Sequence, residues 1–321
     1  MKRRDFVICA AVLALPRVSR AQRKTPVIGL LGNDSVKPSP FATGLVDVLR
    51  DRGWVAGRDF QVEDRVTLEG YGDYAQSMTE LIRAKVDIIV ANGATATVAA
   101  AKATKQIPIV MSVGVDPVAS GLVASLSRPG GNVTGVYTLA SALNAKRMEL
   151  LKEANPGLSS VGVLLAFNVG NPAYRLDAEE AARKLNVQLH FSEARTPEDI
   201  DDAIAELAKM RVGAFFIAPG TMLLTRSTRV VGAVAKHRIP AVYSGARYAD
   251  AGGLLVYYPS RGKNLARVAG YVDRILKGAR PGELAVEQSS DVELAVNLKT
   301  AKALGIEIPQ SILVRADRVI E

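Results

Sequence analysis

The chain of 321 residues has a single cysteine, Cys9, and only two histidines, His190 and His237. Cys9 lies in an N-terminal segment that we expect to be removed, which would leave a working protein without thiols. Such a protein has no thiol catalysis, no disulfides and no thiolate metal ligands, and it tolerates an oxidising compartment. The two histidines are not spaced as a ligand pair, so the sequence predicts no metal site.

The motifs of nucleotide-dependent and nucleophilic enzymes are also missing. No G-x-S-x-G and no P-loop occur, and the stretch GLLG at 29–32 does not match the G-x-G-x-x-G of dinucleotide sites. No run of basic residues with interleaved aromatic residues is present, which argues against nucleic-acid binding. We therefore expect no cofactor and no catalysis. An enzyme is kept as an alternative, and Asp116 with Glu69 is the one acid–base pair that the pattern offers it.

Residues 1–21 are predicted to be an export signal. Three basic residues at 2–4 precede an apolar run over 6–15, and Ser19 and Ala21 provide small side chains at the two positions that a signal peptidase recognises. A membrane span needs roughly 20 apolar residues, so a run of about 10 predicts removal rather than anchoring. The pair Arg3-Arg4 resembles a twin-arginine signal, with the general secretory route as the alternative. The mature protein is expected in the periplasm; the other interpretation is a buried N-terminal helix with basic flanks.

Composition is that of an ordinary α/β protein, with 48% apolar and 5% aromatic residues. The formal net charge of +9 falls to about +5 without residues 1–21, which hold five basic residues and one acidic residue. This remaining charge is spread along the chain and needs no charged partner to explain it. A mature length of about 300 residues is long for one hydrophobic core and sufficient for two lobes.

Apolar strand-like runs alternate with helix-like segments in two successive series. The first series begins at 26–31 and continues through strands at 60–67, 86–91 and 107–111; the second begins at 161–165, after a polar stretch at 141–146. Strands that alternate with helices predict parallel sheets covered on both faces. The fold class expected is therefore α/β, with two doubly wound parallel-sheet lobes joined by a hinge. We expect lobe one at 22–140, lobe two at 141–250, and crossover and C-terminal segments shared between the lobes at 251–321.

Loops at the carboxyl ends of these strands carry hydrogen-bonding residues. In two-lobed parallel-sheet proteins such ends border a cleft, where ligands bind and which can close about a hinge. Each of these residues has an alternative role as a simple helix N-cap. The predicted ligand-binding residues are Asn33, Ser35, Asn92, Thr95 and Asp116 on lobe one, and Asn168, Asn171, Thr221 and Tyr243 on lobe two.

Three motifs in the first half resemble the core signature of a family of ABC transporter substrate-binding proteins: IPIV at 107–110, DPVASGLVASL at 116–126 and RPGGNVTG at 128–135. AGGL at 251–254, VNLKTAKALG at 296–305 and PQSILVRAD at 309–317 resemble its later motifs. The resemblance implies a type I periplasmic binding fold that captures a small organic ligand, such as an amino acid or an aromatic compound, by cleft closure. It also implies an ABC permease and its ATPase subunit as partners, and a monomeric protein.

The chain departs from the family pattern at two places. Ala218-Pro219 stands where the family often has Asp-Pro, and Ala94-Thr95 stands where it often has Thr-Pro. The first departure removes a carboxylate that could pair with a ligand ammonium group, and Asp116 is the remaining candidate anion. Two functions other than transport are kept as alternatives: a ligand sensor that signals to a membrane receptor, and the periplasmic enzyme.

Overall fold

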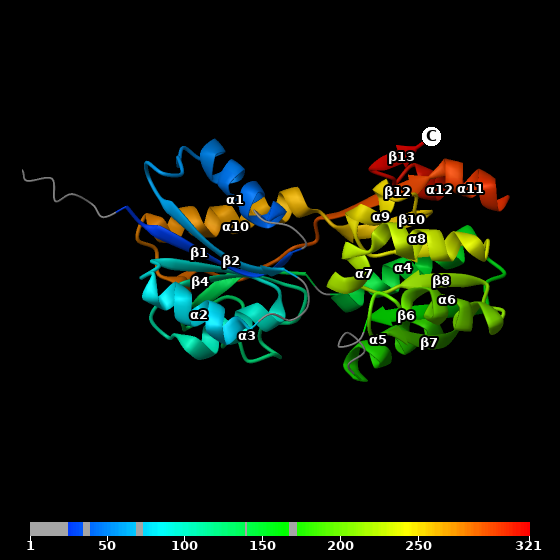
Figure 1. Ribbon diagram of the computed structural model, residues 1–321, viewed down its shortest axis with the longest axis horizontal. Helices are drawn as coiled ribbons and strands as arrows, with labels where there is room; N and C mark the ends of the chain where they lie inside the picture. Colours follow the sequence, from blue (N-terminus) through cyan, green and yellow to red (C-terminus); the bar gives the residue numbers. More distant parts are fainter. Residues whose placement is uncertain (1–24, 35–38, 69–72, 139, 167–171) are drawn as a thin grey trace, which may run out of the picture.

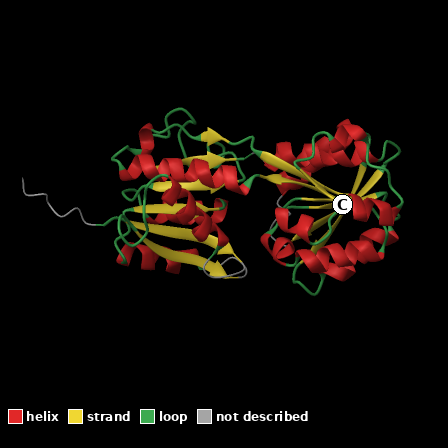
Figure 2. Ribbon diagram, turned by 90° about the horizontal axis from the view of Figure 1, so that it is seen from above, coloured by secondary structure: helices red, strands yellow, loops and turns green. Residues whose placement is uncertain are grey.

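The computed structural model describes residues 25–34, 39–68, 73–138, 140–166 and 172–321. These residues form two α/β lobes, each built on one sheet with helices on both faces (Figures 1 and 2). The predicted fold class is confirmed. The predicted export signal lies outside the described residues. Within them, no helix is long and apolar enough to cross a membrane.

Lobe one has a six-stranded sheet in the order β11-β5-β4-β3-β1-β2, and all its strand pairs are parallel. Helices α1 and α10 cover one face, and α2 and α3 cover the other. The strands are β1 (Val27–Asp34), β2 (Gln61–Leu68), β3 (Ile88–Asn92), β4 (Ile109–Val113), β5 (Val133–Tyr137) and β11 (Glu287–Gln288). The helices are α1 (Pro40–Asp51), α2 (Tyr74–Arg83), α3 (Ala94–Ala103) and α10 (Arg261–Leu276).

Lobe two has a seven-stranded sheet in the order β13-β12-β10-β9-β8-β6-β7, and among its described strand pairs only β10–β12 is antiparallel. Its strands are β6 (Ser160–Ala166), β7 (Gln188–Ala194), β8 (Ala214–Ile217), β9 (Ala241–Tyr243), β10 (Leu255–Pro259), β12 (Val292–Asn297) and β13 (Arg318–Ile320). Its helices are α4 (Ala140–Ala154), α5 (Pro172–Lys184), α6 (Ile200–Lys209), α7 (Thr221–Thr225), α8 (Ser227–Lys236), α9 (Ala246–Asp250), α11 (Leu298–Leu304) and α12 (Gln310–Leu313). A short 3₁₀ helix, η1 (Pro281–Glu283), precedes β11.

The chain passes between the lobes at three places. It leaves lobe one between β5 and α4, returns between β10 and α10, and leaves again between β11 and β12. The segment from residue 251 onward is consequently divided: α10 and β11 pack in lobe one, whereas β10, β12 and β13 belong to the sheet of lobe two (Figure 1). The last two crossings lie side by side, because the backbone N–H of Ser260 donates to the Asp291 carbonyl oxygen at 2.9 Å.

Helix α4 spans the stretch that the sequence pattern marked only as a polar break. Two of its polar side chains, Asn144 and Arg147, are buried with exposed fractions of 2% and 1%. The Arg147 Nε donates to the Tyr257 carbonyl oxygen at 2.7 Å, and its Nη1 donates to Asn144 Oδ1 at 2.8 Å. Buried polar residues interrupt the apolar periodicity by which an amphipathic helix is recognised, which explains why the sequence did not reveal it.

The RPGGNVTG stretch at 128–135 connects loops at the amino ends of the strands of lobe one, the ends that face away from the cleft. Asn132 Nδ2 donates to the carbonyl oxygens of Ile107 and Thr104, at 2.8 and 3.1 Å. The Gly130 N–H donates to the Gly282 carbonyl oxygen at 3.2 Å. A Cβ on Gly282 would stand 2.8 Å from the Gly131 carbonyl oxygen, so only glycine allows this approach of the two backbones. The motif is therefore structural.

Gly135 in β5 provides a stability test. Its φ is +133°, and a Cβ there would lie 2.3 Å from the Met111 carbonyl oxygen of the neighbouring strand β4. Gly135→Ala is expected to lower the free energy of unfolding by about 3 kcal/mol or more, because both the backbone conformation and the strand pairing must distort.

The control is Gly232→Ala, on the exposed face of α8 with open space around the added Cβ. It is expected to raise the free energy of unfolding by up to about 1 kcal/mol. Urea unfolding measures both; equal stability of Gly135→Ala and wild type would contradict this account.

Buried tyrosines predict a loss of stability in alkali. Tyr271 Oη donates to the Ala285 carbonyl oxygen, and burial raises the pKa of Tyr271 from 10.0 to about 12. The phenol of the unfolded chain ionises first, so its contribution to stability is complete below pH 10 and is lost as the pH rises toward 12. The free energy of unfolding in urea should fall across this window, with a smaller fall in Tyr271→Phe. A fall of equal size in the variant would show that Tyr271 is not responsible.

Candidate ligand-binding cleft

A cavity of about 430 Å³ lies between the two lobes, next to the chain crossings. Both lobes and the start of α10 contribute to its wall. The lining residues are Phe41, Asn92, Gly93, Ser112, Val113, Gly114 and Thr138 of lobe one; Arg261, Asn264 and Leu265 of α10; and Leu224, Thr225, Ser244, Gly245, Ala246, Arg247, Tyr258 and Pro259 of lobe two.

The wall on lobe one is made by the carboxyl ends of adjacent parallel strands. Asn92 of β3 stands in register with Ser112 of β4, and Thr138 follows β5. The Gly93 N–H donates to the Ser112 carbonyl oxygen at 2.8 Å, and the Thr138 N–H donates to the Val113 carbonyl oxygen at 2.9 Å. Backbone bonds therefore hold this edge, and it presents hydroxyl and amide side chains to the cavity.

Helix α3 begins at this edge. Its N-cap is Gly93, whose φ of +99° favours glycine, and no side chain caps the first turn. Free N–H groups at a helix N-terminus attract negatively charged groups. The start of α3 thus adds a partial positive charge to a wall that otherwise carries neutral polar groups.

The wall on lobe two is formed by the turn from β9 into α9. Gly245 packs so closely against Leu224 of α7 that a Cβ would stand 2.5 Å from Leu224 Cδ1. This close contact holds the turn against α7. Arg247 follows in this turn, and Arg261 lies at the start of α10. These arginines are the charged side chains among the described lining residues, and both also interact with other parts of the protein. Guanidinium groups are well suited to bind carboxylates.

Apolar side chains complete the cavity. Phe41 at the start of α1 and Leu265 of α10 lie on lobe one, and Leu224 of α7 lies on lobe two. Phe41 has an exposed fraction of only 5%. A cavity with apolar walls and a few polar groups is typical of sites for small amphipathic molecules.

Of the predicted site residues on lobe one, one lines the cavity and others lie on the exposed surface. Asn92 lines the cavity. Thr95 is exposed on the first turn of α3, outside the lining. Asp116 is exposed, and its Oδ1 accepts from the backbone N–H groups of Val118 and Ala119 at 2.8 and 3.1 Å, so its carboxylate caps its own turn.

On lobe two, Tyr243 is in the core rather than at the cavity surface. Its side chain is 2% exposed, its ring lies 5.0 Å from that of Tyr248, and burial raises its pKa well above the usual range. Ala218, where the family often has aspartate, is also fully buried and does not line the cavity.

The other predicted residues are at or beyond the limits of the described chain. Asn33 is the next-to-last residue of β1, with its backbone paired to β2, and Thr221 is the first residue of α7; the side chains of both lie outside the described part. Ser35, Asn168 and Asn171 lie outside it altogether.

Sequence reasoning missed Arg247, Tyr258, Arg261 and Asn264. Arg247 had a detectable signal, because it is a lone cation in the turn that follows a strand, two residues after Gly245. The other three lie on both sides of the second chain crossing, and their place at the cavity depends on how that crossing folds back. Within the described residues, no group of three or more histidine, cysteine or acidic side chains is placed to hold a metal ion.

Two parallel-sheet lobes, three chain crossings and a cavity between strand ends define a two-lobed ligand-binding protein of the type I periplasmic binding class. The chain belongs to the ABC transporter substrate binding protein family, whose model matches residues 25–320. The resemblance seen in the sequence motifs is thereby confirmed.

The comparisons with individual proteins agree with this assignment. A tyrosine-binding protein of Clostridioides difficile is 27% identical over 269 residues, which cover 82% of this chain and 76% of the relative. The crystal structure of a conserved domain protein from Vibrio cholerae has a TM-score of 0.83 at 25% identity, over 92% of this chain and 100% of that chain. The fold is also shared by an ABC domain from Streptococcus pneumoniae in complex with L-Trp, with a TM-score of 0.81 at 24% identity over 92% and 100% of the two chains.

Two tyrosines near the cavity should respond differently to loss of their hydroxyl groups. The buried Tyr248 Oη has no hydrogen-bond partner among the described residues, whereas Tyr258 Oη donates to Glu293 Oε2 at 2.7 Å. Tyr248→Phe is expected to leave stability unchanged or raise it by up to about 1 kcal/mol, and Tyr258→Phe to cost about 1.5 to 3 kcal/mol. Thermal and urea unfolding measure both. A larger cost for Tyr248→Phe than for Tyr258→Phe would contradict the assigned contacts.

Proposed function

We propose that this protein is the periplasmic binding component of an ABC-type importer and captures an aromatic amino acid in the cleft between its lobes. The observation that carries the proposal is the composition of the cavity wall, in which two arginines and several hydroxyl and amide groups adjoin an apolar surface. A carboxylate suits the arginines and the free start of α3, and an aromatic side chain suits Phe41, Leu224 and Leu265.

The related proteins support this class of ligand. A curated relative is named a tyrosine-binding protein, and a protein of the same fold was crystallised with L-Trp. Each residue of the wall serves binding in this proposal, and none is required for a covalent step. We accordingly propose a carrier and not an enzyme.

Capture requires that the lobes close on the ligand, and the chain crossings are the segments that would bend. The ligand contacts come from strand ends on both lobes, so a bound molecule joins the two walls and favours the closed arrangement. The closed monomer would then deliver its ligand to a membrane permease coupled to an ATPase. Membership of an ABC transporter family supports delivery to a permease over signalling to a receptor.

The first test is ligand binding by the mature protein. Isothermal titration with L-tryptophan, L-tyrosine and L-phenylalanine is expected to give saturable binding, whereas glycine and L-lysine should bind far more weakly. Small-angle scattering should show a smaller radius of gyration with ligand. A protein that neither binds an aromatic amino acid nor changes shape with one would refute the proposal.

A filled cavity tests the location of the site. Ser112→Phe places a ring in the cavity wall and is expected to weaken binding by at least about 10-fold, since the ring occupies ligand space. Ser120→Phe, on the exposed turn after Asp116, is the matched control and should bind as wild type. Equal loss in both variants would place the ligand elsewhere or indicate general unfolding, which thermal melting distinguishes.

A further inference from the structure

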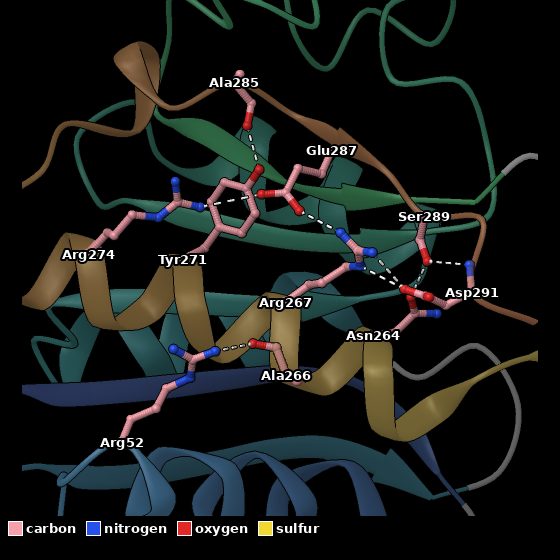
Figure 3. A network of polar contacts seen from close by, with 10 residues as sticks. All are labelled: Arg52, Asn264, Ala266, Arg267, Tyr271, Arg274, Ala285, Glu287, Ser289 and Asp291. Carbon is pink, nitrogen blue, oxygen red and sulfur yellow. Dashed lines mark hydrogen bonds and ion pairs between the residues drawn. The ribbon is translucent and has the colours of Figure 1, made fainter.

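Asn264 is a cavity-lining residue that is held by a side chain from the last chain crossing. It lies in the first turn of α10, and its Oδ1 accepts a hydrogen bond from Ser289 Oγ at 2.6 Å. Ser289 is 3% exposed and follows β11 where the chain leaves lobe one for the last time. Figure 3 shows the two side chains meeting above α10.

The segment that carries Ser289 is clamped on both sides by one guanidinium group. Arg267, one turn after Asn264, donates from Nε to Asp291 Oδ2 at 2.8 Å and from Nη1 to Glu287 Oε2 at 2.9 Å (Figure 3). The Ser289 N–H also donates to the Tyr137 carbonyl oxygen at 2.7 Å. The position of the Ser289 hydroxyl is thus fixed by its own backbone and by the residues two before and two after it.

The direction of this hydroxyl decides the orientation of the Asn264 amide. Ser289 Oγ accepts from the Asp291 N–H at 3.3 Å and gives its own proton to Asn264 Oδ1. With Oδ1 engaged, the amide turns its Nδ2 away from Ser289, and among the described residues Nδ2 has no partner. The side chain lines the cavity, so it offers N–H donors to whatever occupies the cavity.

Arg261 is a second hydrogen-bond donor on the same side of the cavity as Asn264. It precedes Asn264 by three residues on α10, and residues three apart lie on the same face of a helix. Both side chains line the cavity. A guanidinium and an amide N–H next to each other present convergent donors, which suit the two oxygens of one carboxylate.

We propose that Asn264 recognises the ligand carboxylate by donating from Nδ2, and that Ser289 is the positioning residue that holds the amide in the donor orientation. This inference rests on the proposed function, and it names residues that sequence motifs did not indicate. It also connects the proposed recognition group to the chain crossings. Asp291, which Arg267 holds on α10, accepts a backbone hydrogen bond from Ser260 of the neighbouring crossing. The recognition group is therefore attached to the segments about which the lobes would turn.

The test is a set of binding titrations with L-tryptophan and L-tyrosine on the mature protein. Asn264→Ala should weaken binding by about 10-fold, the loss of a hydrogen bond to a charged group. Asn264→Asp, of the same shape, should weaken it by about 100-fold, because an acceptor then faces the ligand carboxylate. Ser289→Ala should weaken binding by about 3- to 10-fold with little change in the melting temperature of the free protein.

Non-additivity separates positioning from general structure. In the Asn264→Ala background, Ser289→Ala should cause no further loss of affinity, because the group that it positions is gone. Ser311→Ala is the matched control: Ser311 Oγ donates to Glu153 Oε1 at 2.6 Å on lobe two, away from the cavity, and its loss should leave binding unchanged.

Two results overturn the inference alone: wild-type affinity in Asn264→Ala, or a Ser289→Ala effect of equal size in both backgrounds. Wild-type protein that binds neither amino acid overturns the proposed function and this inference with it. The two failures are thereby distinguished by the wild-type titration.

Discussion

The common direction of the strands in each sheet is the constraint on which the rest of this structure depends. Parallel strands must be joined by helices that return along the sheet, so the carboxyl ends of neighbouring strands collect at one edge. Asn92, Ser112 and Thr138 meet at such an edge in lobe one, and Ser244 follows the corresponding strand, β9, in lobe two. The cavity exists because these two edges adjoin.

The crossings then decide which residues join those edges. Helix α10 packs in lobe one but arrives from a strand of lobe two, so Arg261 and Asn264 of its first turn border the cavity beside the crossing. The adjacent crossing from β11 to β12 is fastened to the same helix through Arg267. In lobe two, the Glu293 carboxylate of β12 accepts from the hydroxyl groups of Tyr258 and Ser260, at 2.7 and 2.5 Å. Tyr258 and Ser260 belong to the crossing from β10 to α10. Polar contacts thus tie the two crossings to each other and to both lobes.

This arrangement would confine the proposed closure of the lobes to a few backbone bonds. Glu287 and Asp291 are held on α10 by Arg267, and residues from Val292 onward are paired with β10, beginning with Val292 opposite Pro259. If the lobes close as proposed, the junction of Asp291 and Val292, with Pro259 and Ser260 alongside, is the stretch that would absorb the rotation. Hinges of two-lobed binding proteins are commonly a few residues at the ends of regular elements.

Local patterns revealed much of the fold and part of the site. Continuous apolar runs such as those of β3 and β4 indicate strands buried on both faces, and the glycine and polar residues after them indicate strand ends. Asn92 was predicted in this way, and it lines the cavity. Asp116 has the same local pattern, yet its carboxylate caps its own turn, and Tyr243 ends a strand but points into the core. Local sequence does not distinguish these outcomes, because a cap and a ligand contact use the same side chains.

The sequence alone determined the alternation of strands and helices, the two lobes and the family, because these depend on short-range periodicity and on contiguous motifs. The tertiary structure alone decided that α4 buries Asn144 and Arg147, and that Arg261 and Asn264 of α10 border the cavity. The contact between Asn264 and Ser289 joins residues 25 positions apart across a chain crossing. No local pattern encodes such a contact, since it forms only when the return of the chain to lobe one brings the helix and the crossing together.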